Sequence, residues 1–310
     1  MTRPVTIVVR GACAREELEA SLAALLGELE WRAAGDEVLL LDEEGRGELE
    51  GWAATRFPPP ATFERASFEL RTLVRTRGGS APSALRAALA EATHEHVFVM
   101  SPRLRVGAQF LEPLCAALED ERVFAAVPAL RGAGPELGVE AFWRAGELDL
   151  GPPADPTSAE LAFLPLEALM ARRDELVARP LDGLFDHGPW LGRDLAWRAR
   201  REGRAIVRVA AASVELPPGG AVESPLEEAC GRLLFTWKHL DEEELWREHQ
   251  AALLARTVRA AEEEDRDSLL ALALALDQLP ALARSRPSGS ARLRFRALLG
   301  REGEGRELDA

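Results

Sequence analysis

The stretch that most constrains the fold is residues 78–118, where a turn, a helix, a strand and a second helix follow one another. A Gly-Gly turn opens it, and the helical pattern after the turn keeps its leucines on one face. The apolar run 97–100 has the length of a buried strand, and the loop 101–107 separates it from the next helix. Because ligands of open α/β sheets bind beyond the carboxyl ends of the strands, we expect this loop to carry functional residues.

Strands alternate with helices on both sides of that stretch. Apolar runs at 5–9 and 38–41 flank a helical pattern, which predicts a parallel βαβ unit. We therefore predict an α/β fold, in which residues 4 to about 216 form a single, mostly parallel sheet flanked by helices. The Gly- and Pro-rich segment 131–157 is interpreted as a mobile connection over the edge of this sheet.

Only helical patterns follow Pro225. We accordingly predict a sheet domain at residues 1–225, a C-terminal helical region at 226–285 and a flexible charged tail at 286–310. The tail includes one short arginine-rich piece, at 291–299.

The charge balance argues against a nucleic-acid partner, although it leaves local basic patches open. The chain has 38 basic and 52 acidic residues, a net charge of −14, whereas phosphate binding requires an excess of Lys and Arg. Three well-separated cysteines support neither a disulfide framework nor a thiolate metal site. With a first strand so close to the N-terminus, we expect a cytoplasmic protein.

Four segments, in this order, resemble the family 2 glycosyltransferases of GT-A fold over about residues 4–250. They are VTIVVRGACAREELEASLAALL, EVLLLDEEG, the central stretch described above, and RDLAWRARREGRAIVRV. A fifth, RLLFTWKHLDEEELWREH, resembles the helical tail of rhamnosyltransferase-like members. The resemblance implies a nucleotide-diphospho-sugar transferase fold and transfer of a sugar to a polysaccharide or glycolipid acceptor.

The catalytic motifs of that family do not carry over. Its acidic metal motif falls on Ser101, Pro102 and Arg103, where no carboxylate remains for a divalent cation. Its catalytic acid falls in the window 190–192, which reads WLG, and its late histidine falls near Glu215. The sequence therefore predicts that no divalent metal is required.

Candidate nucleotide-binding residues come from the same comparison. Asp42 and Glu43 end a predicted strand and match the family's acids that contact the base; a carboxylate suits a ring N–H donor, and the alternative is a loop or capping acid. Arg103 and Arg105 could neutralise a diphosphate without metal, the alternative being exposed arginines in an arginine-rich chain. Ser101 shares their loop, and Arg86 replaces an asparagine of the family's central helix.

Asp186, His187 and Asp194 are the candidate catalytic groups. Inverting sugar transfer needs a base within reach of the acceptor hydroxyl, and these groups border the empty window. The alternative for His187 is a surface or capping role, and Asp194 could instead be a first-turn acid of a helix.

Two hypotheses remain open at this point. One is a glycosyltransferase that uses a nucleotide-sugar donor and that need not require a metal. The other is a catalytically inactive relative that serves as a binding or scaffold partner, because a fold does not determine a function. In either case the C-terminal helices are the expected surface for a protein partner or for peripheral attachment to the inner membrane.

Overall fold

The computed structural model describes residues 2–10, 14–32, 34–42, 48–57, 68–74, 81–132, 139–152, 158–185, 189–217, 224–285 and 293–300. Its main strands are β1 (Val5–Arg10), β2 (Asp36–Asp42), β3 (Phe68–Val74), β4 (His96–Met100), β5 (Arg105–Val106), β6 (Val123–Arg131), β9 (Ala168–Arg172) and β10 (Ala205–Glu215). Its helices are α1 (Arg15–Arg32), α2 (Glu48–Arg56), α3 (Ala81–Glu91), α4 (Leu111–Ala117), α5 (Arg173–Ala178), α6 (Trp190–Arg201), α7 (Pro225–His239), α8 (Glu243–Glu262), α9 (Arg266–Asp277) and α10 (Leu279–Ser285).

The main sheet has the strand order β3-β2-β1-β4-β9-β6-β10-β5. Strands β1, β2, β3 and β4 pair in parallel, as do β6 and β10. Strand β9 runs antiparallel between β4 and β6, and the short β5 is antiparallel to β10. The predicted mostly parallel sheet flanked by helices is therefore confirmed.

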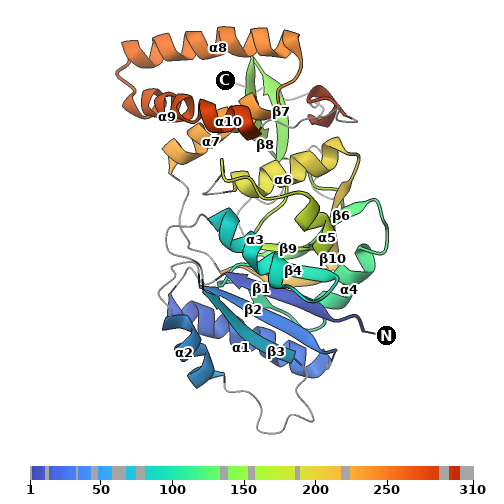
Figure 1. Cartoon of the computed structure of the whole chain (residues 1–310). Coiled ribbons are helices and arrows are strands. Elements are labelled where there is room, and N and C mark those ends of the chain that lie inside the picture. The colour runs from blue at the N-terminus through green and yellow to red at the C-terminus, as the bar shows by residue number, and fades with distance from the viewer. Residues whose placement is uncertain are drawn as a thin grey trace.

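Each strand sends alternate side chains to opposite faces of the sheet, as its period of two requires. Ile7 and Phe98 belong to a core shared with α1 and α4, whereas Val8 and Val97 belong to a core shared with α3, α6 and α7. Figure 1 shows α1 and α2 on one side of the sheet and α3, α5 and α6 on the other, with α7 to α10 beyond α6.

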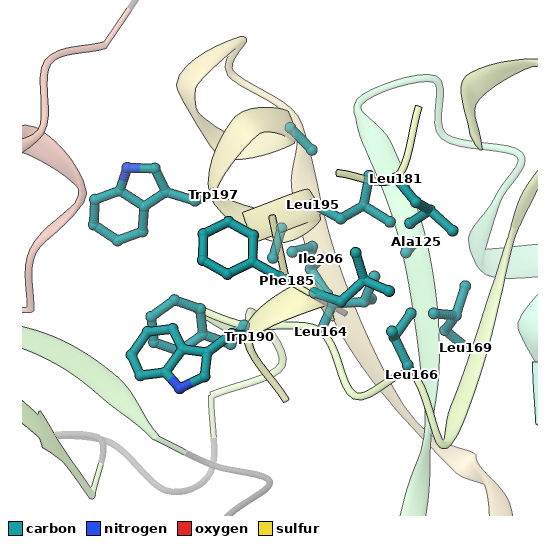
Figure 2. Close-up of a cluster of buried hydrophobic side chains, with 14 of the residues drawn as sticks. Ala125, Leu164, Leu166, Leu169, Leu181, Phe185, Trp190, Leu195, Trp197 and Ile206 are labelled. Atoms are coloured by element: carbon teal, nitrogen blue, oxygen red, sulfur yellow. The ribbon is translucent and has the colours of Figure 1, made fainter. Parts of the chain in front are cut away.

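Aromatic residues connect α6 to the C-terminal helices. Figure 2 shows Leu195 of α6 directed toward Leu181 and Ala125, while Trp190 and Trp197 lie on the other side of the helix. The rings of Trp190 and Trp197 each lie 5.4 Å, centroid to centroid, from Phe235 of α7. The C-terminal helices therefore complete the same core as the sheet.

A second, two-stranded sheet corrects the prediction of a single sheet and a mobile connection at 131–157. Strands β7 (Glu140–Arg144) and β8 (Glu147–Gly151) pair antiparallel around a two-residue turn. Ala145 and Gly146 both have positive φ, 49° and 83°, which matches the twist that tight hairpins favour. Glycine content alone suggested a loop, but Ala141, Phe142 and Leu148 are buried and hold the hairpin in place.

The tip of this hairpin is docked on α8 (Figure 1). His249 Nδ1 lies 2.9 Å from the carbonyl oxygen of Gly146, and the indole N–H of Trp237 donates to His249 Nε2 at 2.9 Å. A Cβ atom at Gly146 would lie 2.5 Å from the carbonyl oxygen of Glu248, so only glycine fits this contact. The hairpin thus joins the sheet region to the C-terminal helices.

In the region predicted to be helical, the described residues form α7 to α10 with short turns between them. Ser224 and Glu227 form a capping box at the start of α7. Within the predicted tail, residues 293–300 are packed, since Phe295 is completely buried and lies 5.1 Å from Trp197. Among the described helices, none is long and apolar enough to cross a lipid bilayer.

The close contact of α6 with α7 occurs at Gly231 and can be tested by substitution there. A Cβ atom there would lie 2.2 Å from Trp190 Cδ1. We expect Gly231→Ala to destabilise the protein by about 1–3 kcal/mol, because overpacking outweighs the gain in helix propensity. Chemical denaturation measures the change.

Gly27→Ala is the matched control, since Gly27 lies in α1 with no atom within 4 Å of the added Cβ. This change should stabilise the protein by about 0.5–1 kcal/mol. Equal effects of the two substitutions would contradict the packing described for Gly231.

Candidate functional site

The carboxyl ends of β1, β2 and β4 form one edge of the sheet. Parallel pairing aligns Arg10 with Leu41 of β2, and Val9 with Met100 of β4. Asp42 therefore follows one residue beyond Arg10 on one side, and Ser101 lies level with Arg10 on the other. The structure thus brings two of the predicted nucleotide-binding residues, Asp42 and Ser101, to the same edge, which we call the carboxyl edge.

The loop after Met100 is held in a tight turn. The backbone N–H of Ser101 donates to the carbonyl oxygen of Glu167 at 2.7 Å, and that of Leu104 donates to the carbonyl oxygen of Ser101 at 3.1 Å. Leu104 is completely buried, and the Ser21 hydroxyl donates to its carbonyl oxygen at 2.5 Å. These contacts fix the direction in which the intervening Arg103 leaves the backbone.

Arg103 bridges segments that are distant in sequence. Its Nη2 donates to the carbonyl oxygen of Pro217 at 2.8 Å, and its Nε lies 3.4 Å from Glu17 Oε1 in the first turn of α1. Only 16% of the side chain is exposed. The structure therefore places a fixed, largely buried guanidinium beside the carboxyl edge, where the resemblance predicted a missing metal motif.

The remaining predicted nucleotide-binding residues lie apart from this centre or outside the described residues. Arg105 is exposed on β5, in register with Glu215 on β10. Arg86 is exposed on α3. Glu43 lies outside the described residues, as do the catalytic candidates Asp186 and His187.

Asp194 is completely buried between α6 and α7. Its Oδ1 lies 2.5 Å from Lys238 Nζ and 2.8 Å from His239 Nε2, and its Oδ2 lies 2.9 Å from Arg198 Nε. Lys238, the only lysine of the chain, also lies 2.5 Å from Asp182 Oδ2. We call these five residues the buried ionic cluster. It ties α6 to α7, and an acceptor sugar cannot reach Asp194 in this structure.

The charge states of this cluster follow from its contacts. Burial alone would raise the pKa of Asp194, but the bond from His239 and the charges of Arg198 and Lys238 hold that pKa well below its usual range. Burial lowers the pKa of His239, despite the opposing effect of Asp194. The carboxylate is therefore ionised and the imidazole neutral, with its Nε2 hydrogen donated to Asp194.

The window that should hold the family's catalytic acid is closed by packing. Leu191 is 5% exposed, and a Cβ atom at Gly192 would lie 2.2 Å from the carbonyl oxygen of Leu164. Close packing leaves no room here for a carboxylate side chain. At this window, where the sequence has no acid, the backbone of α6 packs directly against the backbone of Leu164.

The residues after Met100 do not fit a divalent cation. Hard cations favour sets of oxygen ligands that include carboxylates, whereas residues 101–103 offer only a hydroxyl and backbone carbonyls beside the cationic Arg103, which repels a metal. Within the described ranges no three His, Cys, Asp or Glu side chains form a group that could hold a metal ion. Metal independence stays a prediction.

Comparison with known proteins supports the fold. No family model matches the chain, and no curated protein matches it in sequence. A crystal structure of GalNAc-T7 with UDP, GalNAc and Mn²⁺ matches with a TM-score of 0.53 at 11% identity, over 77% of this chain. The match covers 48% of that protein, so this chain spans about half its length. The chain thus has a GT-A-like glycosyltransferase fold.

Sequence reasoning missed the contacts that define both sites. Nothing in the local sequence pairs Arg103 with Pro217, or Asp194 with Lys238. One signal was available, because a single lysine in a chain this rich in arginine indicates a position with a special requirement. Lys238 is 4% exposed and meets two carboxylates.

The buried ionic cluster predicts a large effect of Asp194→Asn on stability. The substitution removes the negative charge that Lys238 and Arg198 face in the core, and changes of this kind cost about 3–5 kcal/mol. Chemical denaturation at neutral pH measures this loss. Glu243→Gln removes an exposed ion pair with Arg247 and should have a much smaller effect; an equally small effect of Asp194→Asn would contradict the cluster.

Three buried histidines predict loss of stability between pH 7 and 5.5. Burial lowers the pKa of His96, His239 and His249 below the ordinary value of 6.5. Below that pH the unfolded chain binds protons that the folded protein does not, so stability falls as pH falls. Each histidine contributes up to about 1.4 kcal/mol per pH unit. Glu28 and Asp36, whose pKa values burial raises, act in the opposite direction at lower pH.

Urea midpoints at pH 7.0, 6.0 and 5.5 measure this dependence. His96→Met tests one contribution, because neither ring nitrogen of His96 has a hydrogen-bond partner in the described part of the chain. The variant should flatten the pH dependence. A profile identical to that of the parent protein would exclude His96 as a contributor.

Proposed function

We propose that the protein is a glycosyltransferase of the family 2 type that binds a nucleotide-sugar donor at the carboxyl edge. In this proposal Asp42 contacts the base, and Arg103 supplies the positive charge that a divalent cation supplies in metal-dependent relatives. The acceptor is a polysaccharide or glycolipid. The single observation that carries the proposal is the fixed guanidinium of Arg103 beside the strand ends, in a GT-A-like fold.

The proposed transfer requires a group that stabilises the negative charge on the leaving diphosphate and a base that accepts the proton of the acceptor hydroxyl. The acceptor hydroxyl oxygen attacks the anomeric carbon, and the bond from that carbon to the diphosphate oxygen breaks with its electron pair. The leaving diphosphate therefore gains negative charge, which a guanidinium can stabilise through two parallel N–H bonds. The hydroxyl proton goes to a base, for which Asp186 and His187 are the candidates by sequence position.

The structural neighbour provides separate support, since its crystal contains UDP, GalNAc and Mn²⁺. A nucleotide-sugar donor is therefore a natural ligand class for this fold. The metal in that neighbour also marks the difference expected here, because Arg103 replaces a carboxylate at the corresponding stretch of the family pattern.

Arg103→Ala should weaken nucleoside diphosphate binding about 10- to 150-fold, the loss of a charge-assisted contact worth about 1.5–3 kcal/mol. Binding of the free nucleoside should hardly change. Asp42→Asn should instead weaken nucleoside and diphosphate alike, because it acts on the base. Isothermal titration with UDP, GDP, dTDP and CDP measures both changes, and affinity should be insensitive to EDTA.

Two controls separate charge from structure. Arg103→Lys keeps the charge without the planar fork and should give an intermediate affinity. Arg122, which is 84% exposed and pairs with Asp120, lies away from the carboxyl edge, and Arg122→Ala should leave affinity unchanged. Loss of binding on chelation, restored by Mn²⁺, would contradict the metal-free proposal.

The catalytically inactive relative remains the second candidate, favoured by the closed window at Gly192 and the burial of Asp194. Under this alternative the domain binds a nucleotide or a protein partner without turnover. Incubation with nucleotide sugars distinguishes the two, because an enzyme releases nucleoside diphosphate during transfer or slow hydrolysis. Tight binding without release would favour the inactive relative.

A further inference from the structure

Helix α8 carries an apolar stripe on a face that no other described residue covers. Ala251, Leu254, Val258 and Ala261 recur at alternating intervals of three and four residues, and all four are exposed. Leu254 is 66% exposed and Val258 is 50% exposed. The inward face is separate, since it contains Leu245, His249 and Ala260, which are buried. Figure 1 shows α8 as the outermost helix of the C-terminal region. We call these four residues the outer seam.

The outer seam has the spacing of a helix that packs against another helix. A seam repeating every 3.5 residues presents knobs that fit between the side chains of a facing helix. No charged side chain interrupts this face for the roughly four turns between Arg247 and Glu262, although 29% of the chain is charged. Exposed leucines also continue into the neighbouring helices, at Leu270, Leu274, Leu276 and Leu279. Concentrated exposure of this kind marks an interaction surface.

The charge of this region argues against a membrane as the occupant. Residues 243–285 contain nine carboxylates and five arginines, with no lysine. Amphipathic helices that bind anionic lipid instead carry lysine and arginine beside the apolar face. A second protein helix therefore suits the outer seam better than a lipid surface.

We infer that the occupant is α8 of a second copy of this chain, packed antiparallel across a twofold axis. In the register that brings Leu254 of each copy against Val258 of the other, Ala251 faces Ala261. Small residues then oppose small ones, and large residues oppose large ones. The same register places Arg247 beside the acidic run 262–265 of the other copy, twice by symmetry. Antiparallel helices also align their macrodipoles favourably.

The charge pattern distinguishes this arrangement from a parallel one. Arg247 is 73% exposed at one end of the seam and pairs with Glu243 of the same helix. The acidic run begins at the opposite end of α8, where Glu262 and Glu263 face the negative end of the helix dipole, whereas Asp265 caps α9. Antiparallel packing brings the two ends together, whereas parallel packing would bring the acidic runs of both copies together.

The expected association is moderate. One helix pair buries less area than the standard stable interface of about 1,600 Å² in total. We therefore expect a concentration-dependent dimer of micromolar affinity rather than a permanent one.

Sedimentation velocity on the full chain from about 1 to about 200 μM tests the inference, because this range brackets micromolar affinity. The parent protein should shift from monomer to dimer. Leu254→Glu should remain monomeric throughout, with unchanged circular dichroism, because the side chain it replaces is exposed. Val177, an exposed residue of α5 at 54%, provides the matched control, and Val177→Glu should dimerise like the parent.

A charge exchange tests the orientation. Arg247→Glu and Glu262→Arg should each weaken self-association, because each creates like charges twice across the twofold axis. Mixing the two variants should restore a heterodimer, in which both contacts again join opposite charges. A parent protein that stays monomeric, a Leu254→Glu variant that still dimerises, or a mixture without recovery would each overturn the inference.

Discussion

The structure depends on one buried carboxylate, that of Asp194. Its two oxygens receive contacts from Arg198 on α6 and from Lys238 and His239 on α7. A buried charge is tolerated only where partners satisfy it, so these helices can pack in few ways. The C-terminal helices are consequently part of the main core, with Phe235 against both Trp190 and Trp197.

In this arrangement, the helix that carries an acid in the family pattern has a different role. In the resemblance, the start of that helix brings an acid toward the acceptor. In this protein the first turn of α6 is instead pressed against Leu164, and the one acid of the helix is directed into the core. The same region therefore stabilises the fold, while the chemistry available at the strand ends centres on Arg103.

Much of the fold was predictable because its strands are contiguous apolar runs with clear helical patterns between them. The residues at the strand ends, Asp42 and Ser101, were predictable for the same reason, since parallel strands share a carboxyl edge. The β7–β8 hairpin was missed because an Ala-Gly turn is a weak signal beside several prolines and glycines. The burial of Asp194 could not be predicted, because it depends on Lys238 and His239, more than 40 residues further along the chain.

The segment at 293–300 has a consequence for how the chain matures during synthesis. Phe295 lies against Trp197 and Trp143, and the backbone N–H of Gly300 donates to the carbonyl oxygen of Ala141 at 2.8 Å. The hairpin and the aromatic core thus acquire this cover only after residues 293–300 have left the ribosome. Until then the nascent protein exposes part of the Trp143 and Trp197 rings, which chaperones that recognise exposed aromatic residues can bind.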